Sequence, residues 1–145
     1  MEDVITSEPS LHVIPAHECF ALLRAMSVGR VAVALPDSAP LVVPVNFVLD
    51  GETVVFRTDP GSKLDALRLG PISFEVDWLD PYHHTGWSVL ARGIGYEATP
   101  WEIEHLDLAP WAPGARAHWV RLVVTTITGR RLRAADAVRD GRGYL

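Results

Sequence analysis

The sequence predicts a mainly β protein, an antiparallel barrel of about six strands with about three short helices. Three observations support this fold class. Segments rich in β-branched and aromatic residues recur along the chain, and short turns separate them. Helical periodicity is confined to brief stretches. Gly93 and Gly95 lie inside one long strand-like segment, where they permit the bends that a small barrel needs.

Length and composition fit one globular domain. The chain has 145 residues, of which 48% are hydrophobic and 21% charged. We expect a single domain over residues 1–145, with a core at about 15–132 and a loose tail at 133–145. The formal net charge of −5 disfavours nucleic acid or an anionic membrane as a partner. The acidic start does not resemble a secretory signal, and no apolar run reaches the ~20 residues of a membrane span, so the expected location is cytoplasmic.

The first helix is expected to open at Ile14-Pro15, because proline is favoured in a first helical turn. Gly29 is expected to stop it. Residues 1–11 form a polar lead-in. Cys19, the single cysteine, is expected to be a small buried hydrophobe and not a redox group.

Turn residues delimit the expected strands. Asp50-Gly51 is a hairpin signal that pairs the second strand with the third. A capping box from Thr99 to Glu102 predicts a helix that runs to about Leu108. The strands are expected at residues 30–35, 41–49, 52–58, 71–78, 86–98 and 117–127.

The turn after the third strand carries the strongest chemical signal. A strand end, a glycine turn and a helix that starts at Ser62 would bring free backbone N–H groups together. Arg57, Thr58, Ser62 and Lys63 add two cations and two hydroxyls, which is what a phosphate group requires. A plain β-to-α turn with solvated cations explains the same residues equally well.

Proline inside the second strand is the next unusual feature. Pro44 cannot donate to the sheet ladder, so it belongs at an edge or a bulge, and Asn46 should share its face. The break could present backbone groups to a ligand, or it could only protect an edge. Glu75, Asp77 and His118 are weak candidates for proton transfer, because a solvated sheet face is the commoner reason for such carboxylates.

Four motifs in this order resemble the pyridoxamine 5′-phosphate oxidase-like family of flavin-binding split barrels. They are Val43-Pro44-Val45-Asn46-Phe47, Phe56-Arg57-Thr58-x-x-Gly61-Ser62-Lys63, Phe74-Glu75-Val76-Asp77 and Gly86-Trp87-Ser88-Val89. The resemblance covers about residues 15–132. It implies a Greek-key-like split β-barrel that forms a homodimer with FMN at the interface.

The resemblance also assigns site residues. Arg57, Thr58, Ser62 and Lys63 would hold the FMN phosphate, and Pro44, Val45 and Asn46 would run beside the ring. Trp87 and Ser88 would approach from the neighbouring side or from the other subunit. The implied function is an FMN-dependent oxidoreductase acting on a small molecule that the sequence does not identify. The alternatives are a reductase that uses the deazaflavin F420 and a non-catalytic flavin-binding or interaction protein.

The vitamin B6 oxidases carry a basic residue on the second strand, where this chain has Leu41-Val42-Val43. They also have two basic residues after the serine of the turn, where this chain has Lys63 and then Leu64. Pyridoxamine phosphate is therefore not the expected substrate.

Overall fold

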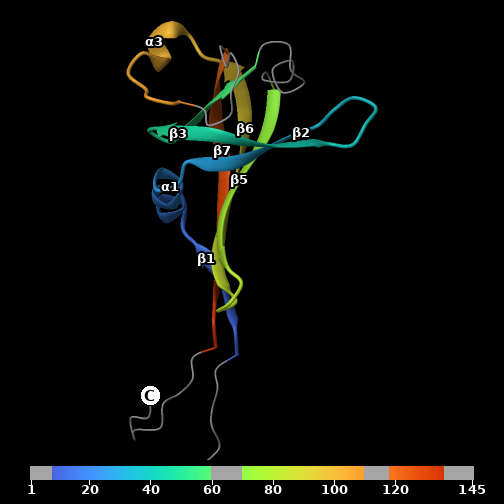
Figure 1. Cartoon of the computed structure of the whole chain (residues 1–145), viewed down its shortest axis with the longest axis vertical. Coiled ribbons are helices and arrows are strands. Elements are labelled where there is room, and N and C mark those ends of the chain that lie inside the picture. The colour runs from blue at the N-terminus through green and yellow to red at the C-terminus, as the bar shows by residue number, and fades with distance from the viewer. Residues whose placement is uncertain (1–7, 60–69, 110–117, 136–145) are drawn as a thin grey trace, which may run out of the picture.

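The computed structural model describes residues 8–59, 70–109 and 118–135. Strands dominate this part of the chain, and Figure 1 shows their arrangement. In chain order the elements are β1 (Ser10–Ile14), α1 (Ala16–Arg24), β2 (Val28–Val33), β3 (Leu41–Asp50), β4 (Thr53–Thr58), β5 (Gly70–Asp80), β6 (Thr85–Glu97), α3 (Pro100–Ile103) and β7 (His118–Arg133).

Six of the strands close into an antiparallel barrel. Their order is β7-β4-β3-β2-β5-β6, and β6 pairs again with β7. The strands β2, β3 and β4 form a meander, and β5 returns to pair with β2, which is a Greek-key connection. The expected mainly β, split-barrel fold is confirmed. β1 is added outside the closed ring, along the second half of β7.

The barrel interior is filled by alternate residues of the strands. Phe47 and Phe74 meet edge to face there, with their ring centroids 4.8 Å apart. α1 contributes Cys19, Phe20 and Leu23 to the same core. The Cys19 thiol is buried as expected, and burial raises its pKa.

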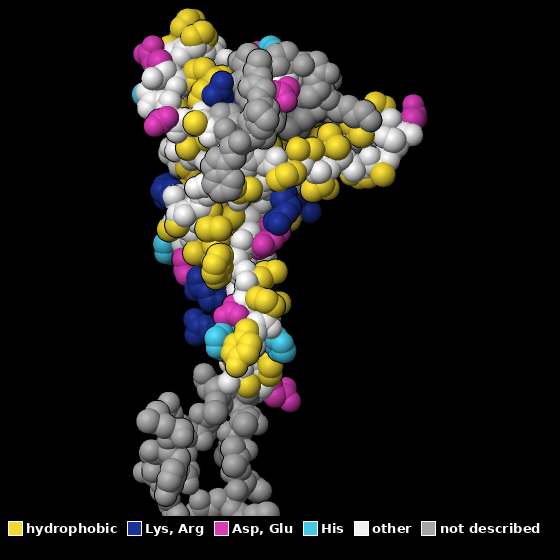
Figure 2. Space-filling view, viewed as in Figure 1, with side chains coloured by type: hydrophobic (Ala, Val, Ile, Leu, Met, Phe, Trp, Pro, Cys, Tyr) yellow, Lys and Arg dark blue, Asp and Glu magenta, His cyan; other side chains and the backbone are white. Residues whose placement is uncertain are grey.

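The strands β5, β6 and β7 extend beyond the barrel into a long ribbon, along which β1 lies (Figure 1). Figure 2 shows hydrophobic side chains spread over the surface of this ribbon. Among its residues, the large apolar side chains exposed to solvent are Leu11, Val13, Trp78, Leu79, Tyr82 and Leu132. The ribbon therefore presents an apolar surface that the single chain does not cover.

Local expectations were wrong at both ends of the chain. The first helix ends at Arg24, and Gly29 lies inside β2, where an added Cβ would come 2.3 Å from the Phe74 ring. The expected lead-in contains the start of β1. The last strand continues to Arg133, because its second half pairs with β1 and β6.

The capping box is confirmed, since Thr99 N–H and Oγ1 both donate to Glu102 Oε1, at 3.0 and 2.8 Å. The helix ends at Ile103 and not near Leu108. The helix expected after Ser62 lies outside the described residues. Within the described part, no helix is long and apolar enough to cross a membrane.

Candidate functional site

The barrel opens where β3 and β4 separate. Phe47 and Phe56 are the last paired residues of the two strands. Beyond them, β3 pairs only with β2, and β4 pairs with β7. The segment 44–46 therefore has an open edge that faces the end of β4. Pro44 lies at this edge, as its missing N–H predicts.

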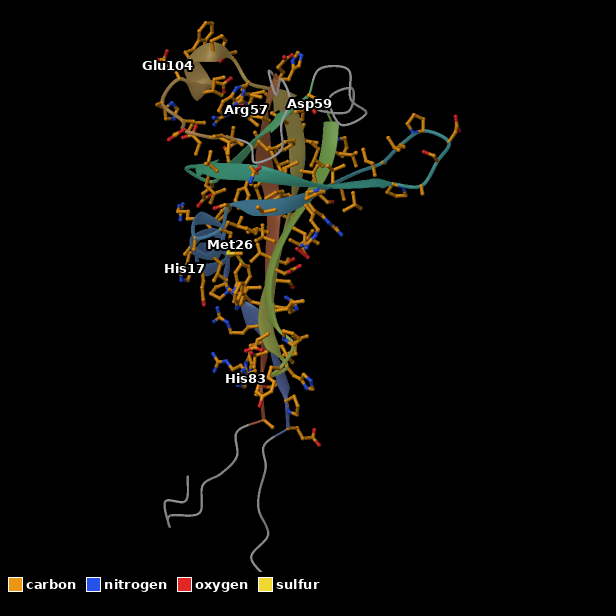
Figure 3. All side chains as sticks on the ribbon, viewed as in Figure 1. His17, Met26, Arg57, Asp59, His83 and Glu104 are labelled. Carbon is orange, nitrogen blue, oxygen red and sulfur yellow. The ribbon has the colours of Figure 1, made fainter. Side chains whose placement is uncertain are left out.

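Arg57 stands at the end of β4, on the far side of this opening. Its Nη1 donates to the backbone oxygen of Leu108 at 3.1 Å, and its guanidinium carbon lies 4.9 Å from the centroid of the Trp119 ring. Figure 3 shows Arg57 and Asp59 at the same end of the barrel as Glu104. The guanidinium is thus held towards β7 and the segment after α3.

Of the three other expected phosphate ligands, the structure describes Thr58. Thr58 is next along β4, and its side chain is only 1% exposed. It pairs with His118, whose Nδ1 lies 2.8 Å from Glu97 Oε1. Ser62 and Lys63 lie outside the described residues.

A polar network anchors α3 to the barrel. Arg121 of β7 is at its centre, with a side chain only 11% exposed. Its Nη1 donates to Asp50 Oδ2 at 2.6 Å, and its Nε donates to the Tyr96 hydroxyl at 3.0 Å. The Tyr96 hydroxyl in turn donates to Glu102 Oε2 at 2.9 Å. The hydrogen bond from Arg121 and a second from His105 hold the pKa of Asp50 below its usual value.

A row of side chains crosses the outer face of the sheet from Pro44. Arg30 of β2 pairs with Pro44 on one side and with Glu75 of β5 on the other. Since neighbouring strands lie ~4.8 Å apart, Glu75 is about 10 Å from Pro44 along this row.

Arg30 is shared by two carboxyl groups. Its Nη1 lies 3.2 Å from Asp77 Oδ2 and 3.5 Å from Glu75 Oε1. Glu75 Oε1 is buried and has no hydrogen-bond partner among the described residues. Burial and the adjacent Asp77 raise the pKa of Glu75 to about 7. The pair can therefore hold one proton near neutral pH.

Trp87 and Ser88 are not brought to the opening within one chain. They lie on β6 opposite Trp78 and Asp77 of β5. Two strands, β2 and β5, separate them from Pro44.

Comparison with known proteins gives the family. The family model described as pyridoxamine 5′-phosphate oxidase matches residues 15–131, which is most of the chain and includes all of the barrel strands except the last two residues of β7. The chain belongs to this family. The uncharacterized protein Rv0080 of Mycobacterium tuberculosis is 31% identical to it over 124 residues, which cover 79% of this chain and 81% of that protein.

Solved structures of similar proteins share the fold. An FAD binding protein from Mycobacterium smegmatis is 34% identical, with a TM-score of 0.68, and the match covers 86% of this chain and 100% of that one. A putative pyridoxamine 5′-phosphate oxidase from Corynebacterium glutamicum is 27% identical, with a TM-score of 0.71, covering 87% and 96%. A protein that binds FAD therefore has the same split-barrel fold as this member of the pyridoxamine 5′-phosphate oxidase family.

Sequence reasoning missed several residues of this family member's site. Leu108 and Trp119 contact Arg57 only after folding, and no local pattern pointed to them. Arg30 could have been found from the sequence, because it is the charged residue on the exposed face of an otherwise apolar strand.

Proposed function

We propose that this chain is an FMN-dependent oxidoreductase that works as a homodimer. One observation carries the proposal: the separation of β3 from β4 places the open edge at 44–46 opposite the Arg57-Thr58 strand end. An open strand edge offers backbone groups to a flat ring, and a cation beside it suits a phosphate.

In this proposal Arg57, Thr58, Ser62 and Lys63 hold the FMN phosphate, and Pro44, Val45 and Asn46 line the ring. When bound, the flavin supplies hydride or electron transfer. The protein orients the ring against a small-molecule substrate and shields it from water. Arg30 and Glu75 lie on the row that starts at Pro44, and a flat ring that extended about 10 Å across the sheet would reach them.

The Glu75–Asp77 pair then has a role beside the ring. A carboxyl group that keeps a proton near neutral pH can donate it and take it back. Arg30 limits the repulsion between the two carboxyls and keeps them together. Glu75 is therefore the proton-holding group of the proposed site.

The homodimer is proposed on two grounds. The resemblance assigns Trp87 and Ser88 to the ring, and β2 and β5 separate them from Pro44 within one chain, so we expect a second copy to bring them to the segment 44–46. The exposed apolar side chains of the ribbon, among them Trp78 at 61% exposure, need a partner to be buried.

The similarity to the Mycobacterium smegmatis protein favours FAD as a second candidate cofactor. FAD carries the same ring and a phosphate at the same distance from it, so the same residues would serve. F420 offers a flat ring and a phosphate as well.

The test is the absorption spectrum of the purified protein, followed by mass analysis of what denaturation releases. We expect a yellow protein that releases FMN. Release of FAD or F420 would change the proposed cofactor and leave the proposed site unchanged. A colourless protein whose Tm does not rise with excess FMN or FAD would overturn the proposal in favour of a non-catalytic role, because a ligand that binds only the native state must raise stability.

A further inference from the structure

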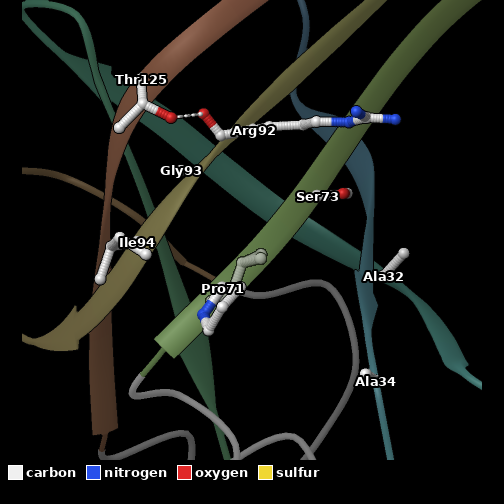
Figure 4. Close-up of a pocket in the computed structure, with 9 residues that line it drawn as sticks. Ala32, Ala34, Pro71, Ser73, Arg92, Gly93, Ile94 and Thr125 are labelled. Carbon is white, nitrogen blue, oxygen red and sulfur yellow. Dashed lines mark hydrogen bonds between the residues drawn. The ribbon is translucent and has the colours of Figure 1, made fainter.

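A groove lies on the outer face of the barrel, across β2, β5 and β6. Its volume is about 410 Å³, within the usual range for small-molecule sites. Ala32 and Ala34 form one side, Pro71 and Ser73 the floor, and Gly93 and Ile94 the other side (Figure 4). The lining is therefore small and mainly apolar, with two hydroxyl groups, those of Ser73 and Thr125.

Arg92 of β6 borders this groove. Figure 4 shows its side chain running from β6 across β5, past Ser73 towards β2. Within the described part of the chain, no hydrogen bond or ion pair engages its guanidinium. By contrast, Arg30, Arg121 and Arg131 are all paired with carboxylates. An exposed guanidinium beside an apolar hollow can bind an anion without first breaking an ion pair.

A β-bulge fixes the backbone at this point. Arg92 pairs with Thr126 and Gly93 with Val124, so Thr125 of β7 is the extra residue. The Thr125 hydroxyl donates to the backbone oxygen of Arg92 at 3.1 Å. Bulges re-aim side chains and are frequent beside functional sites.

The outer face of the sheet between the groove and the proposed ring site is apolar. Ala32 pairs with Val42 of β3, whose side chain is 59% exposed, and Pro44 follows two residues later on the same face. Small apolar side chains therefore lead from the groove to the edge at Pro44. A molecule in the groove would lie next to a ring held at that edge.

We propose that this groove binds a small organic monoanion, a carboxylate with a flat apolar body, through Arg92. The guanidinium takes the carboxylate in a two-pronged contact, and the Ser73 hydroxyl is a second donor within the groove. One cation suits one negative charge, and Glu75, two residues from Ser73 on the same face, disfavours a second. The inference that this anion is the substrate rests on the proposed function. The inference that the groove binds it does not.

The test is equilibrium dialysis of the full chain with cinnamate and with its uncharged counterpart, cinnamyl alcohol. We expect cinnamate to bind more tightly than the alcohol. Arg92→Met keeps the length of the side chain and removes the charge, so it should weaken cinnamate binding at least about tenfold and leave alcohol binding unchanged. Arg92→Lys should restore part of the loss. Ala32→Leu fills the groove and should weaken both ligands.

Arg133→Met is the matched control, because Arg133 is also exposed and unpaired among the described residues but lies at the far end of β7. It should leave cinnamate binding unchanged. If Arg92→Met and Arg133→Met lost the same amount of cinnamate affinity, the effect would come from net charge alone and the proposal would be overturned. A wild-type protein that does not distinguish the acid from the alcohol would also overturn it. Dialysis of flavin-free protein separates the two proposals: cinnamate binding that persists there supports the groove even if no flavin is ever bound.

Discussion

Phe47 of β3 and Phe56 of β4 form the last pair before the two strands take different partners. Their side chains are almost fully buried in the core, so the point of separation is fixed by packing. The open edge at Pro44 and the strand end at Arg57 both start from this pair. The position of the proposed cofactor site thus depends on the core beneath it.

The first prediction concerns the phosphate. Arg57→Ala combined with Lys63→Ala should weaken FMN binding at least tenfold, because a charge-assisted phosphate contact contributes ~1.5–3 kcal/mol. Fluorescence titration of the flavin measures the dissociation constant. Arg24→Ala with Arg133→Ala removes the same charge from exposed sites elsewhere and should change it little. Unchanged affinity in the first double variant would place the phosphate elsewhere.

The second prediction concerns the homodimer. Trp78 pairs with Trp87 across the β5–β6 hairpin, so both side chains share a face, and the partner that receives Trp87 should also cover Trp78. Trp78→Glu should therefore shift the protein from dimer to monomer in light scattering after gel filtration. Trp101→Glu is the control, because Trp101 is 71% exposed but lies on α3, outside the ribbon, so this variant should remain dimeric. A wild-type monomer that binds FMN would contradict the proposal.

Much of the barrel was predictable because its strands are rich in β-branched and aromatic residues and are separated by turn residues, and both signals are local. β1 was not, because four of its five residues are not buried and only its pairing with β7 makes it a strand. Gly29 looked like a helix stop, whereas its lack of a side chain makes room for Phe74, which is distant in sequence.

The candidate site was also predictable only in part from local sequence. Pro44 at a strand edge follows from the chemistry of proline alone. The contact between Arg57 and the Leu108 oxygen joins residues 51 positions apart, and no local pattern specifies it. The sharing of Arg30 by Glu75 and Asp77 likewise required the pairing of β2 with β5.

The third prediction concerns pH. The pKa of Glu75 rises from 4.5 to about 7 on folding, so the native state binds more protons than the unfolded state between these values. The free energy of unfolding should therefore fall as pH increases through this range. Glu75→Gln removes this dependence. The Tm of the variant minus the Tm of the wild type should therefore increase as the pH rises from about 5 to about 8. Thermal melts across this range measure the difference, and parallel curves for the two proteins would refute the raised pKa.

The fourth prediction concerns the network beneath α3. Arg121→Met should cost about 2–3 kcal/mol of unfolding free energy, because Asp50 and Glu102 lose the guanidinium that bridges them. Urea unfolding gives the value. Glu18→Gln breaks the more exposed pair with Arg131 and should cost less than about 1 kcal/mol. Equal costs would mean that burial of Arg121 adds nothing to the strength of its contacts.

The fifth prediction concerns the bulge. A Cβ added at Gly93 would lie 1.8 Å from the backbone oxygen of Val123, an atom that cannot move without shifting β7. Gly93→Ala should therefore destabilise the protein by about 2 kcal/mol or more. Ile94→Ala, at the next and half-exposed position, should cost about 1 kcal/mol or less. Because the shift in β7 would also displace Thr125 and the backbone of Arg92, Gly93→Ala should weaken cinnamate binding even at temperatures where it remains folded. A folded Gly93→Ala protein with wild-type affinity would show that the bulge does not position Arg92.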